Sequence, residues 1–121
     1  MDAEGVRALV EHQARAWEQE DVEAIVADFA SDGVLISPGG RWQGHEALRA
    51  AATAFFAVAT EVRITVTRIL LDGDQGAVEW TWSETRRSDG LRITAEDGII
   101  FHLRDGLILT WREYFDTAAW K

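Results

Sequence analysis

The 121-residue sequence predicts an α+β fold in which helices cover one face of an antiparallel sheet. Apolar residues recur at helical spacing through the first half of the chain, and after Thr60 the period changes to two. Turn signals then divide the second half into four long strand candidates, which indicates consecutive hairpins. Because no crossover segments remain between these strands, we expect no parallel pairing.

Three helices are expected before Thr60. The first spans residues ~4–19, where apolar residues form one stripe. Asp21 is a candidate N-cap for a second, short helix that continues through Phe29. The third helix is expected after Gly44, with its apolar residues on one side. These segments are expected to supply the helical layer.

Strands account for most of the remaining chain. A short strand is expected at 34–37, followed by a loop opened by Pro38. The four long strands are expected at 61–71, 76–87, 91–104 and 107–116, with turns at Asp72-Gly73-Asp74, Ser88-Asp89-Gly90 and Asp105-Gly106. The sequence contains no repeat and no linker, so we expect one domain over residues 1–121.

Composition narrows the classes of partner. A formal net charge of −9 disfavours binding to nucleic acid or to an anionic membrane surface. The absence of cysteine excludes disulfides and thiolate chemistry, and it makes a cytoplasmic location the expectation. The N-terminus shows no targeting pattern, and no apolar stretch approaches the ~20 residues of a membrane span.

Three acidic residues fall on apolar rows of the predicted strands. Since side chains alternate across a strand, Asp97 shares the inward row of Ile99 and Phe101. Glu113 likewise follows Trp111, and Glu84 follows Trp82. An acid on an apolar face is paired, neutral or directed into a cavity, because burying a bare charge is unfavourable.

Burial raises the pKa of a carboxyl group, which suits a general acid or base near neutral pH. A single inward acid could equally be a structurally paired one. Three of them interleaved with Trp80, Trp82 and Trp111 favour a pocket. We expect the pKa of Asp97 to lie above its ordinary value, raised by burial and by a second carboxylate nearby.

The sequence contains no common motif for metal binding, nucleotide binding or serine-hydrolase catalysis. His12, His45 and His102 are expected to be structural, and the sequence contains neither H-E-x-x-H, nor a glycine-rich phosphate loop, nor G-x-S-x-G. No cofactor and no metal are therefore expected.

Several segments resemble one known family. They are Ala16-Trp17 before an acidic break, Gly44-His45-Glu46-Ala47-Leu48, and Asp105-Gly106 followed by Trp111-Arg112-Glu113-Tyr114-Phe115-Asp116. Together with the order of elements they resemble the SnoaL-like branch of the nuclear transport factor 2 superfamily. The resemblance implies a cone, described as a cystatin-like α+β barrel, in which a curved antiparallel sheet wraps around three N-terminal helices. It also implies an apolar pocket at the open end and a homodimer formed through the sheet.

The closing W-R-E-Y-F-D is similar to the W-R-D-Y-F-D of limonene epoxide hydrolases, and Glu113 matches the acid of that motif. The hydrolase pattern also needs R-x-D on the second long strand, where this chain has Trp80 and Trp82. Leu35 and Ser37 stand where a Tyr and an Asn would help to place water. We therefore expect no epoxide hydrolysis.

The leading hypothesis is a cofactor-independent enzyme of SnoaL-like type that cyclises, isomerises or dehydrates a hydrophobic, carbonyl-bearing molecule by proton transfer. Asp97 would be the base and Glu113 a second acid or proton shuttle, while tryptophan indoles could bind the carbonyl or enolate oxygen. Substrate contacts are expected from Trp17, Leu35, Ser37, Trp42, Phe56, Trp80, Trp82, Glu84, Ile99, Trp111 and Phe115.

Two alternatives stay open. One is a pocket that binds an apolar ligand without catalysis, where the acids only orient it. The other is an assembly module, because Ile100, Ile108 and Tyr114 fall on the outer row of the sheet. That row also predicts a homodimer through the outer sheet face.

Overall fold

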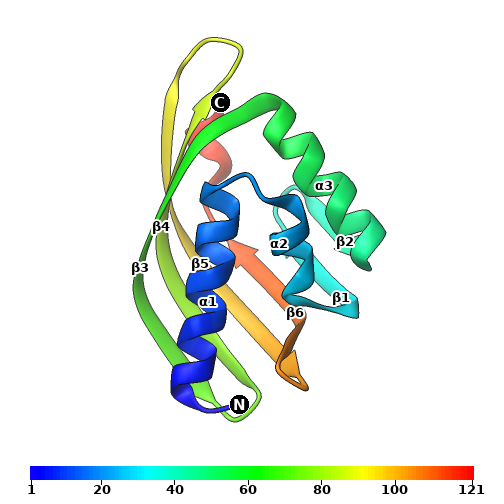
Figure 1. The fold of residues 1–121 in the computed structure, drawn as a ribbon. Coiled ribbons are helices and arrows are strands. Elements are labelled where there is room, and N and C mark those ends of the chain that lie inside the picture. Colours follow the sequence, from blue (N-terminus) through cyan, green and yellow to red (C-terminus); the bar gives the residue numbers. More distant parts are fainter.

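The computed structural model describes residues 1–121 as a helical layer against one curved sheet (Figure 1). The helices are α1 (Ala3–Glu18), α2 (Val22–Ala27) and α3 (His45–Val58). The strands are β1 (Phe29–Ser37), β2 (Gly40–Gln43), β3 (Ala59–Asp72), β4 (Gln75–Arg86), β5 (Arg92–Arg104) and β6 (Leu107–Tyr114). A 3-10 turn, η1 (Thr117–Trp120), follows the last strand.

The sheet has the strand order β2-β1-β6-β5-β4-β3. The meander from β3 to β6 is antiparallel throughout, as predicted. The prediction of no parallel pairing is wrong at one place, because β1 pairs with β6 in parallel. The chain between these two strands, which includes α3, provides the crossover that a parallel pair needs. The α+β class is confirmed, and the sheet curves around α1 without closing into a barrel (Figure 1).

The second helix is shorter than predicted. Its start is as expected, since the Asp21 side chain accepts a hydrogen bond of 3.1 Å from the Ala24 N–H. It ends at Ala27, and Phe29 already belongs to β1, where it pairs with Ile108 of β6. Pairing with β6 satisfies the backbone N–H and C=O groups of this segment, so that one more helical turn is not needed to satisfy them. The predicted loop after Pro38 also forms the short strand β2, which closes a hairpin with β1.

The period-two assignment is confirmed on β4 and β5, where the predicted inward rows are mostly buried and Ile100 on the outer row is 54% exposed. On β6 the assignment is wrong for Ile108, which is completely buried. A register shift beside His102 places Ile108 opposite Leu103, so the rows exchange faces there. Ile108 therefore belongs to the core and is not available for an interface.

The core fills one end of the cone. Val6, Val10 and Ala14 of α1 pack against the concave face of the sheet, in one cluster with Trp80 and Trp111. The rings of these two tryptophans lie 5.7 Å apart. The core thus occupies the side of the sheet nearer the start of α1, and the last turn of α1 is left facing a cavity. None of the helices combines the length and apolar character that crossing a membrane requires.

Candidate functional site

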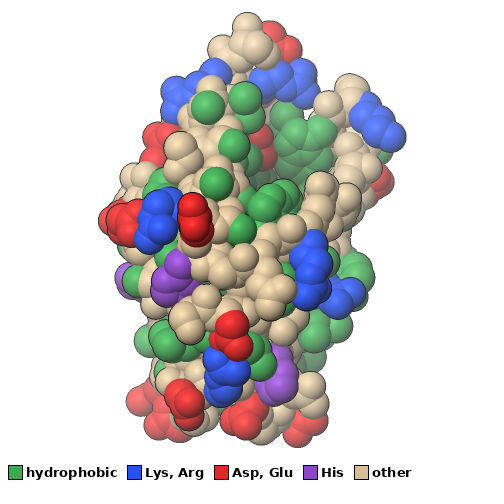
Figure 2. Space-filling model, turned by 90° about the vertical axis from the view of Figure 1, so that its right-hand side faces the viewer, with side chains coloured by type: hydrophobic (Ala, Val, Ile, Leu, Met, Phe, Trp, Pro, Cys, Tyr) green, Lys and Arg blue, Asp and Glu red, His purple; other side chains and the backbone are tan.

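A cavity of about 500 Å³ lies beyond the last turn of α1, between α3, the β1–β2 hairpin and the sheet. Figure 2 shows the hollow in the upper part of one face, with hydrophobic side chains gathered in and around it. Ten of its sixteen lining residues are hydrophobic, so the cavity suits an apolar molecule of small size.

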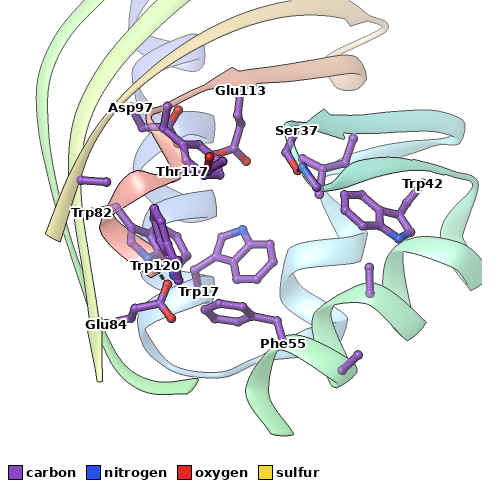
Figure 3. Close-up of a pocket in the computed structure, with 16 residues that line it drawn as sticks. Trp17, Ser37, Trp42, Phe55, Trp82, Glu84, Asp97, Glu113, Thr117 and Trp120 are labelled. Atoms are coloured by element: carbon purple, nitrogen blue, oxygen red, sulfur yellow. Dashed lines mark hydrogen bonds between the residues drawn. The ribbon is translucent and has the colours of Figure 1, made fainter. Parts of the chain in front are cut away.

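Nine of the residues proposed from the sequence line this cavity. They come from α1, β1, β2, β4, β5, β6 and the segment after β6, and they are Trp17, Leu35, Ser37, Trp42, Trp82, Glu84, Asp97, Glu113 and Phe115. The meander and the helices thus bring together residues that are far apart in the sequence (Figure 3).

Four proposed contact residues lie elsewhere. Trp80, Ile99 and Trp111 belong to the core cluster, each with at most 2% of its surface exposed. Phe56 packs against Trp17 from a second small cluster, whereas the neighbouring Phe55 faces the cavity. Successive residues of a helix point about 100° apart, so only one of two adjacent phenylalanines can line a given wall.

Seven lining residues were not expected from the sequence: Gly39, Ala51, Ala54, Phe55, Ala95, Thr117 and Trp120. Helical spacing places Ala51, Ala54 and Phe55 on one face of α3, and Ala95 shares the inward row of Asp97, so these could have been found. Thr117 and Trp120 come from η1, whose only sequence signal is Asp116, an N-cap residue whose side chain accepts a hydrogen bond of 2.9 Å from the Ala118 N–H.

Asp97 lies in the wall of the cavity with only 5% of its surface exposed. It stands directly opposite Trp80 in the β4–β5 register, and the Trp80 indole donates a hydrogen bond of 3.2 Å to its Oδ2. No N–H or hydroxyl group donates to Oδ1. Burial raises the pKa of Asp97 above its ordinary value, and the hydrogen bond from Trp80 opposes this effect.

Glu113 projects from β6 toward Asp97 (Figure 3). Its pKa is raised well above the ordinary value, first by burial and then by the neighbouring Asp97 and the negative charge of that residue. The neighbouring Glu113 in turn lowers the pKa of Asp97. The expected direction for Asp97 is therefore confirmed, but the second carboxyl opposes the shift instead of adding to it. Asp97 and Glu113 therefore form an electrostatically coupled pair of acids in which the pKa of Glu113 is raised well above its ordinary value and that of Asp97 is raised as well.

The indole groups have partners other than those expected. Trp80 donates to Asp97, and Trp82 donates to Glu84 over 2.9 Å, so neither N–H is free for a substrate oxygen. Ser37 differs, because its Oγ accepts a hydrogen bond of 3.2 Å from the Gly39 N–H. The Ser37 hydroxyl hydrogen remains available to a ligand.

Trp17, which lines the cavity at the end of α1, is held in place by a series of hydrogen bonds. Its indole donates to Gln13 Oε1 over 2.9 Å, and the Gln13 amide donates to Asp28 Oδ2 over 2.9 Å. His12 contacts the same Asp28 oxygen at 2.7 Å. Because Gln13 is buried and bonded at both ends of its amide, Trp17 is held in one orientation.

Comparison with known families decides the assignment of this fold. The model of the SnoaL-like domain matches residues 6–111, which is most of the sequence. The chain belongs to the SnoaL-like domain family. The resemblance stated from the sequence is thereby confirmed. A comparison with curated protein sequences gave no match.

Solved structures share the fold of this SnoaL-like chain at low sequence identity. An epoxide hydrolase of the limonene epoxide hydrolase-like type from M. tuberculosis is 26% identical with a TM-score of 0.80, covering 94% of this chain and 84% of that one. A hypothetical protein with a ketosteroid isomerase-like fold from Catenulispora acidiphila, in complex with trimethylamine, is 19% identical with a TM-score of 0.86, covering 92% and 87%. TerC, co-crystallised with polyporic acid, is 20% identical with a TM-score of 0.85, covering 96% and 95%.

Proposed function

We propose that this SnoaL-like protein is a cofactor-independent enzyme that moves a proton on a hydrophobic, carbonyl-bearing small molecule. The supporting observation is that Asp97 and Glu113 both line an otherwise largely apolar cavity, with the pKa of Glu113 raised well above its ordinary value and that of Asp97 raised as well. We assign Glu113 as the group that holds the proton and Asp97 as the base. Two carboxyl groups whose environments separate their pKa values are suited to acting as base and acid in one reaction.

Each group has a distinct part in the proposed reaction. Asp97 takes a proton from the carbon next to the substrate carbonyl, breaking a C–H bond and leaving an enolate. Glu113 gives its proton to the enolate oxygen, with help from the free hydroxyl hydrogen of Ser37. Where a carbon–carbon double bond adjoins that carbon, the enolate is conjugated. The proton on Asp97 then returns to the far carbon of the double bond, the double bond shifts next to the carbonyl, and Glu113 recovers its own proton from the oxygen. The product is an isomer of the substrate, and both carboxyl groups regain their starting states.

The related structures leave the chemistry of the ligand open. One was solved with an amine, trimethylamine, and another with polyporic acid, so the fold accepts ligands of different charge. Cyclisation or dehydration of a carbonyl compound would begin with the same proton abstraction at Asp97. The residues of this cavity, and not the fold, must therefore select the substrate.

Hydrogen–deuterium exchange tests the proposal without knowledge of the natural substrate. 2-Tetralone, a neutral ring ketone, is incubated with the protein in D2O, and proton NMR follows exchange next to its carbonyl. The wild-type protein is expected to accelerate exchange with a bell-shaped pH dependence, and Asp97→Asn to abolish the acceleration. Glu96→Gln is the matched control, since Glu96 lies exposed on the same strand.

A different result would favour the non-catalytic alternative. If 2-tetralone quenches the tryptophan fluorescence but its exchange stays at the buffer rate, the cavity binds such ligands without activating them. Equal exchange rates for wild type and Asp97→Asn would contradict the proposed base.

A further inference from the structure

The cavity contains a second acidic position, separate from the Asp97–Glu113 pair. Glu84 lies on β4 four residues beyond Trp80, the partner of Asp97, which corresponds to roughly 13 Å along a strand. Its side chain lines the cavity and is buried, with 4% of its surface exposed. Figure 3 shows its carboxyl group near Trp17, Trp120 and Phe55. The reaction proposed above gives Glu84 no part.

Glu84 has no cationic partner within the protein. Its hydrogen bond comes from the neutral Trp82 indole to Oε1, and no group donates to Oε2. No Lys, Arg or His lines the cavity. Arg86, two residues along the strand, pairs with Asp89 and donates to the Trp120 carbonyl, and it forms no ion pair with Glu84. A buried carboxylate with one neutral donor is poorly compensated, so the site favours an incoming positive charge.

Aromatic rings surround this acid. The ring centroids of Trp17, Phe55 and Trp82 lie 5.6–5.8 Å from one another, and their planes are inclined by 66–80°. Rings so inclined offer both faces and edges to a neighbouring group, and ring faces attract cations within about 6 Å of their centroids. The hydrogen bond that the Trp17 indole donates to Gln13 Oε1 holds Trp17 in this position.

We propose that the Glu84 end of the cavity binds the cationic ammonium group of the substrate. The substrate class is then a hydrophobic amine that carries its reactive carbonyl roughly 13 Å or less from the nitrogen, as the strand spacing between Glu84 and Asp97 requires. This inference rests on the proposed function in taking the cavity as the substrate site. It adds a preference for charge, because a cavity with three acids and no basic side chain disfavours anionic substrates.

Two probes of nearly equal shape test the preference. Benzyltrimethylammonium carries the charge, and neopentylbenzene replaces its nitrogen with carbon. Binding of each is measured by quenching of tryptophan fluorescence. The wild-type protein is expected to bind the cation about tenfold more tightly than the neutral probe. Glu84→Gln is expected to bring the two affinities together, while Glu96→Gln, which removes an exposed acid, leaves the ratio unchanged.

Phe55→Leu provides a second variant should Glu84→Gln fail to fold, as judged by circular dichroism. Leucine retains apolar bulk but has no ring face, so the cation is expected to lose more affinity than the neutral probe. The inference is overturned if the neutral probe binds as tightly as the cation, if neither probe binds, or if the folded variants keep the wild-type ratio. Exchange of neutral 2-tetralone uses Asp97, Glu113 and Ser37 but not Glu84, so failure here leaves that separate test of the proposed function intact.

Discussion

Replacing Glu113 with glutamine is expected to remove part of the pH dependence of stability. Because the pKa of Glu113 is raised in the folded state, the folded protein binds a proton that the unfolded chain releases. The free energy of unfolding therefore falls as pH rises, starting near the ordinary glutamate pKa and continuing to the raised value. In Glu113→Gln no such proton exists, and the side chain keeps nearly the same size.

The size of the change in unfolding free energy is set by the one proton that the folded protein binds and the unfolded chain releases. Its contribution to the free energy of unfolding falls by about 1.4 kcal/mol for each pH unit within that window. For a small domain this corresponds to a shift in urea midpoint of about 1 M per pH unit. Urea unfolding of both proteins at pH 5 and 6 measures how steeply the free energy of unfolding falls with pH in each. Asp97, whose pKa depends on Glu113, adds to the difference, whereas the exposed carboxyl groups contribute to both proteins alike.

An unfolding free energy that falls equally steeply with pH in the wild type and in Glu113→Gln would refute this reasoning. Glu96→Gln serves as the control, since it removes an exposed carboxyl from β5 and is expected to keep the wild-type slope. If Glu96→Gln also weakens the dependence of the unfolding free energy on pH, the effect does not arise from Glu113.

Three further outcomes are expected. Asp97→Asn remains folded and gains unfolding free energy at pH 7, measured by urea unfolding, because a desolvated charge is removed; an unfolded variant would make Asp97 a structural acid. The protein is expected to form a homodimer through the outer sheet face around Ile100 and Tyr114, both 54% exposed, and a mass of 13.5 kDa by light scattering would contradict this expectation. Limonene oxide is not hydrolysed, since buried Trp80 and the bonded Trp82 replace the charged groups of the hydrolase pattern; turnover above background would disprove it.

Hydrophobic periodicity predicted the elements well because it reports which faces are buried. The inward rows of β4 and β5 follow the alternation almost to their ends. The position of Ile108 could not be predicted, because a bulge is set by how two strands fit together. The parallel pairing of β1 with β6 likewise depends on contacts between distant segments, and it overrode the helical pattern at Phe29.

The candidate site was predicted in outline and missed in detail. Acids on apolar rows are visible in a sequence, so Asp97, Glu113 and Glu84 could be found. Which of the two paired acids holds the proton depends on three-dimensional surroundings, and so do the hydrogen bonds that occupy the Trp80 and Trp82 indoles. No periodic pattern carries this information.

A carbon-13 NMR titration of the side-chain carboxyl groups tests the proposed division of roles between Asp97 and Glu113 most directly. Glu113 is expected to titrate above its ordinary pKa and above Asp97, and Asp97→Asn is expected to lower the pKa of Glu113 by removing the adjacent negative charge. Titration of both groups at or below their ordinary pKa values would contradict this division of roles, and with it the proposed acid–base reaction.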